Sequence, residues 1–147
     1  MKEVVPNMKR RRRTEILIQG DPALAKKLAE SIIAIYDYRE IIAPQQGLTM
    51  VKMRESAKNS LFYMGEVLVT ESKAEIENCI GIGIVVGMKN ELARNLAIID
   101  AAYKANLPET VAWEAELAEA ERQIIQKRAK DQAKLFETKV DFQTMDV

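Results

Sequence analysis

The sequence predicts an α+β fold: an antiparallel β-meander of about four strands, covered on one face by N- and C-terminal helices, with an extended C-terminal helix and tail. Apolar residues recur with helical spacing near both ends, polar and apolar residues alternate through the middle, and glycine or asparagine separates the segments. A chain of 147 residues, 48% of them hydrophobic, is typical of one domain. We expect a basic tail or first helical turn at residues 1–13 and a single domain at 14–147, in which 109–147 form a C-terminal helix and docking tail.

Two helices are expected near the N-terminus. The first spans about residues 8–19 and ends at Gly20, a favourable residue after a helix. Asp21 and Pro22 are typical of an N-cap followed by proline at the first helical position. The second helix has one apolar face, which repeats every four residues at Leu24, Leu28 and Ile32.

The central segment is expected to begin with a β-hairpin. The runs YREIIAP and LTMVKMR flank QQG, which places Gly47 in the turn. From Leu68 to Glu77, charged residues alternate with small or apolar ones, as in a strand with one solvated face.

The stretch GIGIVVG at residues 81–87 is either a phosphate-binding loop or a strand. Val86 occupies the position where the dinucleotide-binding pattern needs its third glycine, so we favour the strand. A three-residue loop at 78–80 would match its isoleucines to the apolar face of the preceding strand. That register places Gly81 and Gly83 on the outer face, where we expect another chain to lie against them.

Two more helices are expected after this strand. Asn90 is the predicted N-cap of the first, and the second extends from Glu109 to about Glu137. The apolar stripe of the second helix thins after Ile125, so this helix either extends off the domain or meets a partner. The predicted core contains Leu28, Ile32, Leu68, Ile76, Ile82, Ile84, Val86, Leu96 and Ile99.

Composition excludes several classes of site. The chain contains no histidine and a single cysteine, Cys79, so the commonest general base is absent and neither a zinc site nor an internal disulfide is expected. Basic and acidic residues balance at 22 each, and no apolar run is long enough to cross a bilayer. We expect a cytoplasmic protein with no catalytic residues, no metal and no membrane partner.

A cluster of basic residues lies near the N-terminus. Residues 1–13 hold six basic residues and one acidic residue, with four arginines at Arg10–Arg13. One interpretation is a phosphate-binding patch, and a stand-alone nucleic-acid-binding or regulatory module using these arginines is the alternative function. We favour a solvated helical turn or frayed end, because no aromatic residues lie between the arginines to stack on bases.

The C-terminal segment KVDFQTMDV is more apolar than an ordinary tail. Val140, Phe142 and Met145 offer apolar anchors, and Asp141 and Thr144 can fix orientation through hydrogen bonds. We predict that this segment docks on a partner chain. The alternative is that it folds back on its own sheet.

The run GEVLVTESKAEIENCIGIGIVVGMKNELARNLAIIDAAYKA and the terminal VDFQTM together resemble the PhnG family, the small G subunit of the bacterial carbon–phosphorus lyase core complex. The resemblance covers roughly residues 14–146 and rests on the order and spacing of its elements, with VDFxTM as the most specific piece. The basic N-terminal residues and the connection at 107–119 depart from the family pattern. The residues that carry the resemblance are Gly65, Glu66, Val69, Thr70, Gly87, Asp100, Val140, Asp141, Phe142, Thr144 and Met145.

This resemblance implies a subunit of a hetero-oligomer with H, I and J type subunits. Such complexes displace adenine from ATP with a phosphonate such as methylphosphonate and form ribose 1-methylphosphonate 5-triphosphate. The family assigns the nucleosidase chemistry mainly to the I subunit. It assigns the later bond cleavage to the J subunit, which uses an iron–sulfur cluster and S-adenosylmethionine. For this chain the resemblance implies an assembly role and no cofactor of its own.

Three carboxylates are the residues on which catalysis by this chain alone would depend. An independent enzyme would use Glu66, Asp100 or Asp141, and the purified chain would then turn over ATP and phosphonate. Asp100 is either a substrate-binding carboxylate or a structural acid that bonds a neighbouring backbone or basic group, and we favour the structural role.

Overall fold

The computed structural model describes the backbone of residues 8–145 and the side chains of residues 8–138. Within that range it has the α+β class that the sequence predicts, with three strands instead of about four. The elements follow one another as α1 (Arg10–Gln19), α2 (Pro22–Ile33), β1 (Tyr38–Arg54), β2 (Leu61–Ile76), β3 (Cys79–Val86), α3 (Asn90–Lys104) and α4 (Glu109–Met145).

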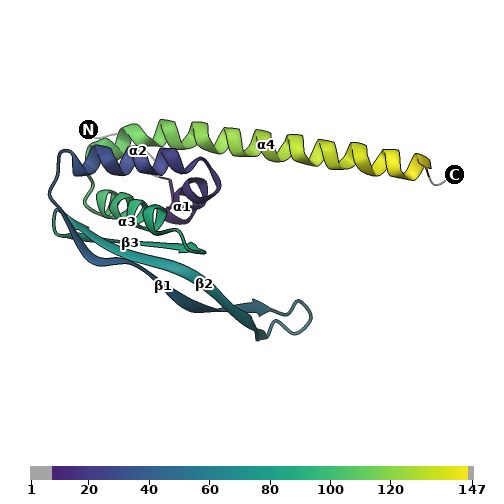
Figure 1. The fold of residues 1–147 in the computed structure, drawn as a ribbon, viewed down its shortest axis with the longest axis horizontal. Coiled ribbons are helices and arrows are strands. Elements are labelled where there is room, and N and C mark those ends of the chain that lie inside the picture. Colours follow the sequence, from purple (N-terminus) through teal and green to yellow (C-terminus); the bar gives the residue numbers. More distant parts are fainter. Residues whose placement is uncertain (1–7, 146–147) are drawn as a thin grey trace.

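The elements are arranged in layers on one side of a sheet. The strands form an antiparallel sheet in the order β1–β2–β3. Helix α3 packs directly on one face, α2 and α1 pack on the other side of α3, and the first half of α4 packs against α1 (Figure 1). Helices from both ends of the chain therefore cover one face, as predicted, and within residues 8–145 no element covers the opposite face of the sheet.

The predicted hairpin at Gly47 does not form. Residues 38–54 are one long strand that pairs with β2 along its length, and the chain reverses at residues 55–60 instead. Register shifts near Ile42 and Gln45 absorb the irregular sequence as bulges. Pro44 has no N–H to donate, which an edge strand such as β1 tolerates because one of its sides has no neighbouring strand.

The hairpin between β2 and β3 also differs from the prediction. Its loop has two residues, Glu77 and Asn78, with φ angles of 49° and 64°, as a type I′ turn requires. Gly81 consequently pairs with Ala74 on the helix-covered face. The predicted faces of β3 are therefore wrong: the glycines point toward α3 and the isoleucines point away from it.

The close approach of α3 to β3 explains this register. A Cβ atom on Gly81 would lie 2.1 Å from the carbonyl oxygen of Ala97, and one on Gly83 would lie 2.1 Å from that of Ala93. Four residues of a helix span about 6 Å and two residues of a strand about 6.7 Å, so the two spacings nearly match. The glycines of β3 therefore pack against a row of alanines on α3, formed by Ala93, Ala97 and Ala101. Larger residues at the glycine positions would hold the helix away from the strand.

The observed core differs from the predicted core because the inner and outer faces of β3 are the reverse of those predicted. Of the predicted core residues, those on the helices and at the end of β2 are buried, namely Leu28, Ile32, Ile76, Leu96 and Ile99. The prediction is wrong for residues of the outer sheet face and of the β1–β2 extension: Leu68, Ile84 and Val86 are exposed, and Ile82 is half-buried.

The ends of the helices follow local sequence signals with one exception. The Asp21 side chain accepts a hydrogen bond from the N–H of Ala23 at 2.9 Å, which confirms the predicted N-cap of α2. Asn106 ends α3 with φ of 53°, and Leu107 donates to the Ala102 carbonyl, as in a Schellman motif. The exception is Asn90, which is the first residue of α3 and does not cap it.

Helix α4 is longer than predicted and projects from the body. It continues to Met145, so the C-terminal segment is a continuation of the helix (Figure 1). Trp113 and Leu117 are buried, whereas every described side chain from Ile125 to residue 138 is exposed. The prediction that the apolar stripe ends near Ile125 and that the helix extends off the domain is confirmed.

The packing of α3 on β3 makes Gly81→Ala strongly destabilising. The added methyl would overlap backbone atoms of α3, and overpacking of this kind typically costs about 1–3 kcal/mol. Gly47→Ala is the matched control, because a Cβ atom there meets nothing within 4 Å. Urea unfolding should show a clear loss for Gly81→Ala and little change for Gly47→Ala. Equal stabilities for the two variants would contradict the close packing.

Candidate functional site

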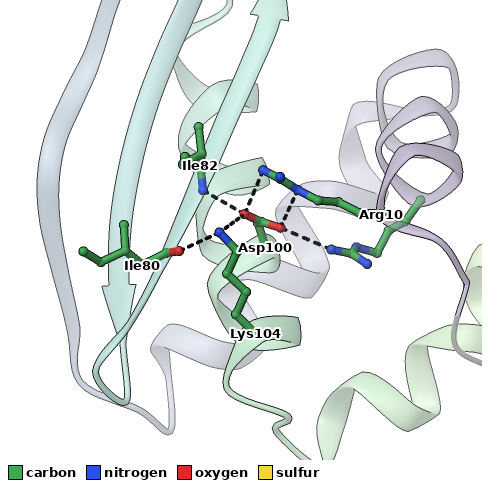
Figure 2. Close-up of polar contacts among 6 residues, drawn as sticks. Arg10, Ile80, Ile82, Asp100 and Lys104 are labelled. Atoms are coloured by element: carbon green, nitrogen blue, oxygen red, sulfur yellow. Dashed lines mark hydrogen bonds and ion pairs between the residues drawn. The ribbon is translucent and has the colours of Figure 1, made fainter.

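The most concentrated polar cluster in the described residues surrounds Asp100 on α3. Its side chain is buried and accepts the backbone N–H of Ile82 at 2.9 Å (Figure 2). Arg10 approaches both carboxylate oxygens at 3.0 and 3.1 Å, Arg13 at 3.2 Å and Lys104 at 3.3 Å. One carboxylate therefore joins α1, α3 and β3, and the structure contains the backbone and basic contacts that the structural role of Asp100 requires.

The Asp100 cluster also covers part of the edge of β3. The Ile82 N–H points to the side of β3 that has no neighbouring strand, and Asp100 accepts it. The Ile80 carbonyl points the same way and accepts a hydrogen bond from Lys104 Nζ at 2.9 Å (Figure 2). Side chains of α3 thus satisfy backbone groups that would otherwise be open to another strand.

A cation–aromatic stack continues from this cluster into α4. The Arg13 guanidinium lies 3.8 Å from the centre of the Tyr103 ring, and Tyr103 meets Trp113 edge-on with centroids 5.8 Å apart. Burial lowers the pKa of Arg13, and burial raises the pKa of Tyr103 to about 12, with the Glu114 carboxylate adding to that shift. Arg13 therefore holds α1 in place in two ways: its guanidinium pairs with Asp100 and stacks on the Tyr103 ring.

All four arginines of the basic cluster belong to the first turn of α1, and each contacts a carboxylate. Arg10 and Arg13 contact Asp100, and Arg11 pairs with Glu15 at 3.2 Å. Arg12 forms a two-pronged pair with Glu121 of α4, and this contact raises the pKa of Arg12 and lowers the pKa of the Glu121 carboxyl. Arg10, Arg11 and Arg12 are exposed, as the predicted solvated helical turn requires, whereas Arg13 is buried.

The carboxylates proposed for an independent enzyme do not come together. Glu66 lies on the part of β2 that extends beyond the helices, opposite Met50. Asp100 lies on α3 at the far edge of β3, with its oxygens engaged by the contacts described above. The side chain of Asp141 lies outside the described residues. No paired carboxylate site is formed by Glu66 and Asp100.

The predicted partner-interface residues have different outcomes. Gly81 and Gly83 are buried against α3, so the geometric basis for placing them at an interface is gone. The side chains of the predicted docking tail lie outside the described residues, and its docking stays a prediction. These residues are Val140, Asp141, Phe142, Thr144 and Met145.

The exchange of faces creates an apolar surface that the sequence interpretation missed. The outer face of β3 carries Ile80, Ile84 and Val86, which are exposed, and the half-buried Ile82. Val69, which pairs with Val86, extends this surface onto β2. The sequence signal for this apolar surface is the alanine row on α3, because alanines let a helix approach a strand so closely that only glycines fit beneath it.

A groove on the helical side is a second surface feature. It has a volume of about 750 Å³ and lies between the α1–α2 junction and α4. Leu24, Ala120 and Ile124 form its apolar part, and Lys27 and Lys127 are among its charged residues. Within this lining, Lys27 pairs with Glu116 at 3.3 Å.

The sequence of this chain matches the profile of a known family. The family profile described as phosphonate metabolism protein PhnG matches residues 8–146, nearly the whole chain. The chain belongs to the PhnG family. The match includes Arg10–Arg13, so the basic turn of α1 lies within the region shared with the family. No curated protein sequence matches the chain.

Several residues that carry the family resemblance have structural roles. Thr70 is fully buried, and its hydroxyl donates to the Gly87 carbonyl at 2.6 Å and accepts the Lys89 N–H at 3.1 Å. Gly87 has φ of 93°, which favours glycine, and leads into α3. Together with Asp100, these residues fix how α3 leaves β3 and lies on the sheet.

Two kinds of feature are absent from the described residues. None of the helices in residues 8–145 has both the length and the apolar content that a bilayer span needs. In the same part of the chain, no group of three potential histidine, cysteine or carboxylate ligands gathers at one point.

Asp100→Asn should destabilise the chain severely. It leaves the buried Arg13 without its counter-charge, and removing one partner of a buried ion pair costs about 3–5 kcal/mol. Asp131→Asn, on the exposed part of α4, is the control and should have little effect. Urea unfolding measures both. An unfolding free energy of Asp100→Asn equal to that of the unaltered chain would overturn the structural role of Asp100.

The buried Tyr103 hydroxyl predicts a specific loss of stability at alkaline pH. Its folded pKa of about 12 lies above the value of about 10 for an exposed tyrosine, so folding favours the protonated phenol. This contribution is complete below about pH 10 and is lost as the pH rises toward 12. Tyr103→Phe removes this contribution. Between about pH 10 and 12, the unfolding free energy should therefore fall more steeply for the unaltered chain than for Tyr103→Phe. Parallel pH profiles would contradict the burial of the hydroxyl.

Proposed function

We propose that this chain is a subunit of the carbon–phosphorus lyase core complex in the catabolism of organic phosphonates. In that complex a phosphonate oxygen replaces the adenine nitrogen at C1′ of the ATP ribose, and adenine leaves with a proton. With methylphosphonate the product is ribose 1-methylphosphonate 5-triphosphate. We assign this chain a supporting role in assembly, and the catalytic groups, the iron–sulfur cluster and S-adenosylmethionine to other subunits.

Membership of the PhnG family supports the phosphonate pathway. The chemistry of the side chains supports a non-catalytic role. The chain has no histidine, and its most buried carboxylate, Asp100, is occupied by a backbone N–H and by cations. A carboxylate neutralised in this way is a poor general base, because its basic oxygens are already used.

The observation that carries the assembly role is the apolar outer face of β3. Ile84 is 51% exposed and Val86 62% exposed on the edge strand β3, beside Glu71 and Val69 of β2, on a sheet face that no described element covers. A folded monomer gains nothing from placing branched apolar residues in water, whereas a subunit interface buries them. We propose that this face contacts one of the H, I or J type subunits.

The test compares two substitutions of the same chemistry. Ile84→Lys places a charge on the outer face of β3, and Ile35→Lys places one at an exposed isoleucine in the α2–β1 connection, away from the sheet face. Each variant is co-expressed with H, I and J type subunits carrying an affinity tag on the I type subunit. We expect recovery of Ile84→Lys to fall at least about tenfold, which is 1.4 kcal/mol of binding free energy. Recovery of Ile35→Lys should match that of the unaltered chain.

Adenine release from ATP and methylphosphonate is measured on the same preparations. It should require this chain in the complex and should fall in proportion to the recovery of Ile84→Lys. The purified chain alone should release no adenine. Turnover by the lone chain would overturn the supporting role, and failure of the unaltered chain to co-purify with any of the three subunit types would overturn the assignment to the complex.

A further inference from the structure

The outer halves of β1 and β2 form a two-stranded arm that extends beyond the helices. The arm consists of residues 48–54 and 61–68, which pair with each other and lie past the start of α3 (Figure 1). The junction is marked by Thr70, which accepts the N–H of Lys89 just before α3 begins. A two-stranded ribbon alone is at best marginally stable in water, so this arm needs additional contacts.

The arm is apolar on both faces. Leu48 and Leu68 pair on the face that continues the helix-covered side of the sheet. Met53 and Phe62 pair on the opposite face, which continues the outer face of β3. Eight of its large hydrophobic residues are between 38% and 66% exposed: Leu48, Met50, Met53, Leu61, Phe62, Tyr63, Met64 and Leu68.

The arm also has an open backbone edge. Within residues 8–145, β3 pairs with β2 only from Val69 to Ile76, and the last bond beyond that joins the Gly87 N–H to the Leu68 carbonyl. Because alternate residues of a strand direct their N–H and C=O to the same side, Glu66 presents both groups to this edge. The edge of β3 is partly covered by Asp100 and Lys104, but along 61–67 β2 has no such cover in the described structure.

The exposed area is that of an interface. A large side chain buries about 150–250 Å² when fully covered, so eight that are about half exposed present about 800 Å². One partner in a stable complex of standard size contributes about 800 Å². Because this area is divided between the two faces of the arm, each face presents about 400 Å², the size of the largest apolar patch on a typical monomer, which is often functional.

The geometry points to insertion of this arm into an apolar cleft of another subunit of the complex, where a strand of that subunit pairs with the open edge of β2 along residues 61–67. This inference rests on the proposed function, which supplies the other subunits. The partner must present apolar residues toward both faces of the arm, with backbone groups opposite Glu66. It is a recognition by strand addition, in which main-chain hydrogen bonds add to side-chain burial.

A second copy of this chain fits the arm less well. Two arms that met edge to edge would satisfy the open edges, but both faces of the resulting ribbon would stay in water. Two arms stacked face to face would cover one face each and leave the edges open. Only a partner that encloses the arm covers Leu48 and Leu68 on one side and Met53 and Phe62 on the other.

The test removes one backbone donor from the open edge. Glu66→Pro deletes an N–H that faces away from β1, so the pairing within the arm is kept while strand addition is blocked. Glu66→Ala removes the same carboxylate and keeps the N–H, and it is the matched control. Each variant competes with the unaltered chain during co-expression with tagged H, I and J type subunits, and the ratio of the two chains in the purified complex is measured.

We expect Glu66→Pro to be incorporated at least about tenfold less than the unaltered chain, and Glu66→Ala to be incorporated equally. Phe62→Ser, on an exposed side chain, should also lose incorporation while the lone chain keeps its melting temperature. Equal incorporation of Glu66→Pro would overturn strand addition, and equal losses for both Glu66 variants would assign the effect to the carboxylate instead.

Size-exclusion chromatography of the purified chain tests whether a second copy of this chain covers the arm. A dimer that Glu66→Pro dissolves would make a second copy the occupant and overturn the inference. If Ile84→Lys loses incorporation but Glu66→Pro does not, the arm inference fails and the proposed function stands. If the unaltered chain does not join the complex at all, both fail.

Discussion

The steric contact between the glycines of β3 and the alanine row of α3 is the constraint on which this structure depends. Gly81 and Gly83 leave no room for a single methyl group, because backbone atoms of α3 already occupy that space. The contact sets the register of the β2–β3 hairpin and the short I′ loop that this register needs. Asp100 on α3 also accepts a hydrogen bond from the backbone of β3 and pairs with Arg10 and Arg13, so α1 is attached where α3 meets β3.

The close packing of α3 on β3 also determines which residues of β3 lie on the surface of the protein. When the glycines of β3 face α3, alternation places its isoleucines and Val86 on the outer face, while Val85 faces α3 and is buried. The apolar outer face is therefore the counterpart of the close approach of α3 to the glycines of β3. The arm and the projecting half of α4 carry further exposed apolar residues.

The sequence predicts most of the helical architecture because its signals are local. Asp21 and Pro22 mark the start of α2, and the apolar stripe of α4 ends where the helix leaves the body. The register of β3 could not be obtained by matching hydrophobic faces, because the deciding factor is volume: isoleucines are apolar, but they cannot fit beneath α3. The residues Pro44 and Gly47 predict a hairpin because both are common in turns, but Pro44 falls within a register shift of the edge strand β1 and Gly47 pairs regularly with Val69. The family was recognisable from spacing, whereas the Asp100 cluster joins residues about 90 positions apart and needed the fold.

The orientation of β3 is the central claim, and thiol labelling tests it most directly. Ile84→Cys and Val85→Cys are made in a Cys79→Ala background, so that each variant has one thiol. Val85 is 2% exposed and Ile84 is 51% exposed. The structure predicts that the thiol of Ile84→Cys reacts much faster than the thiol of Val85→Cys in the free chain. Faster labelling of Val85→Cys would show that the faces of β3 are reversed and would contradict the account.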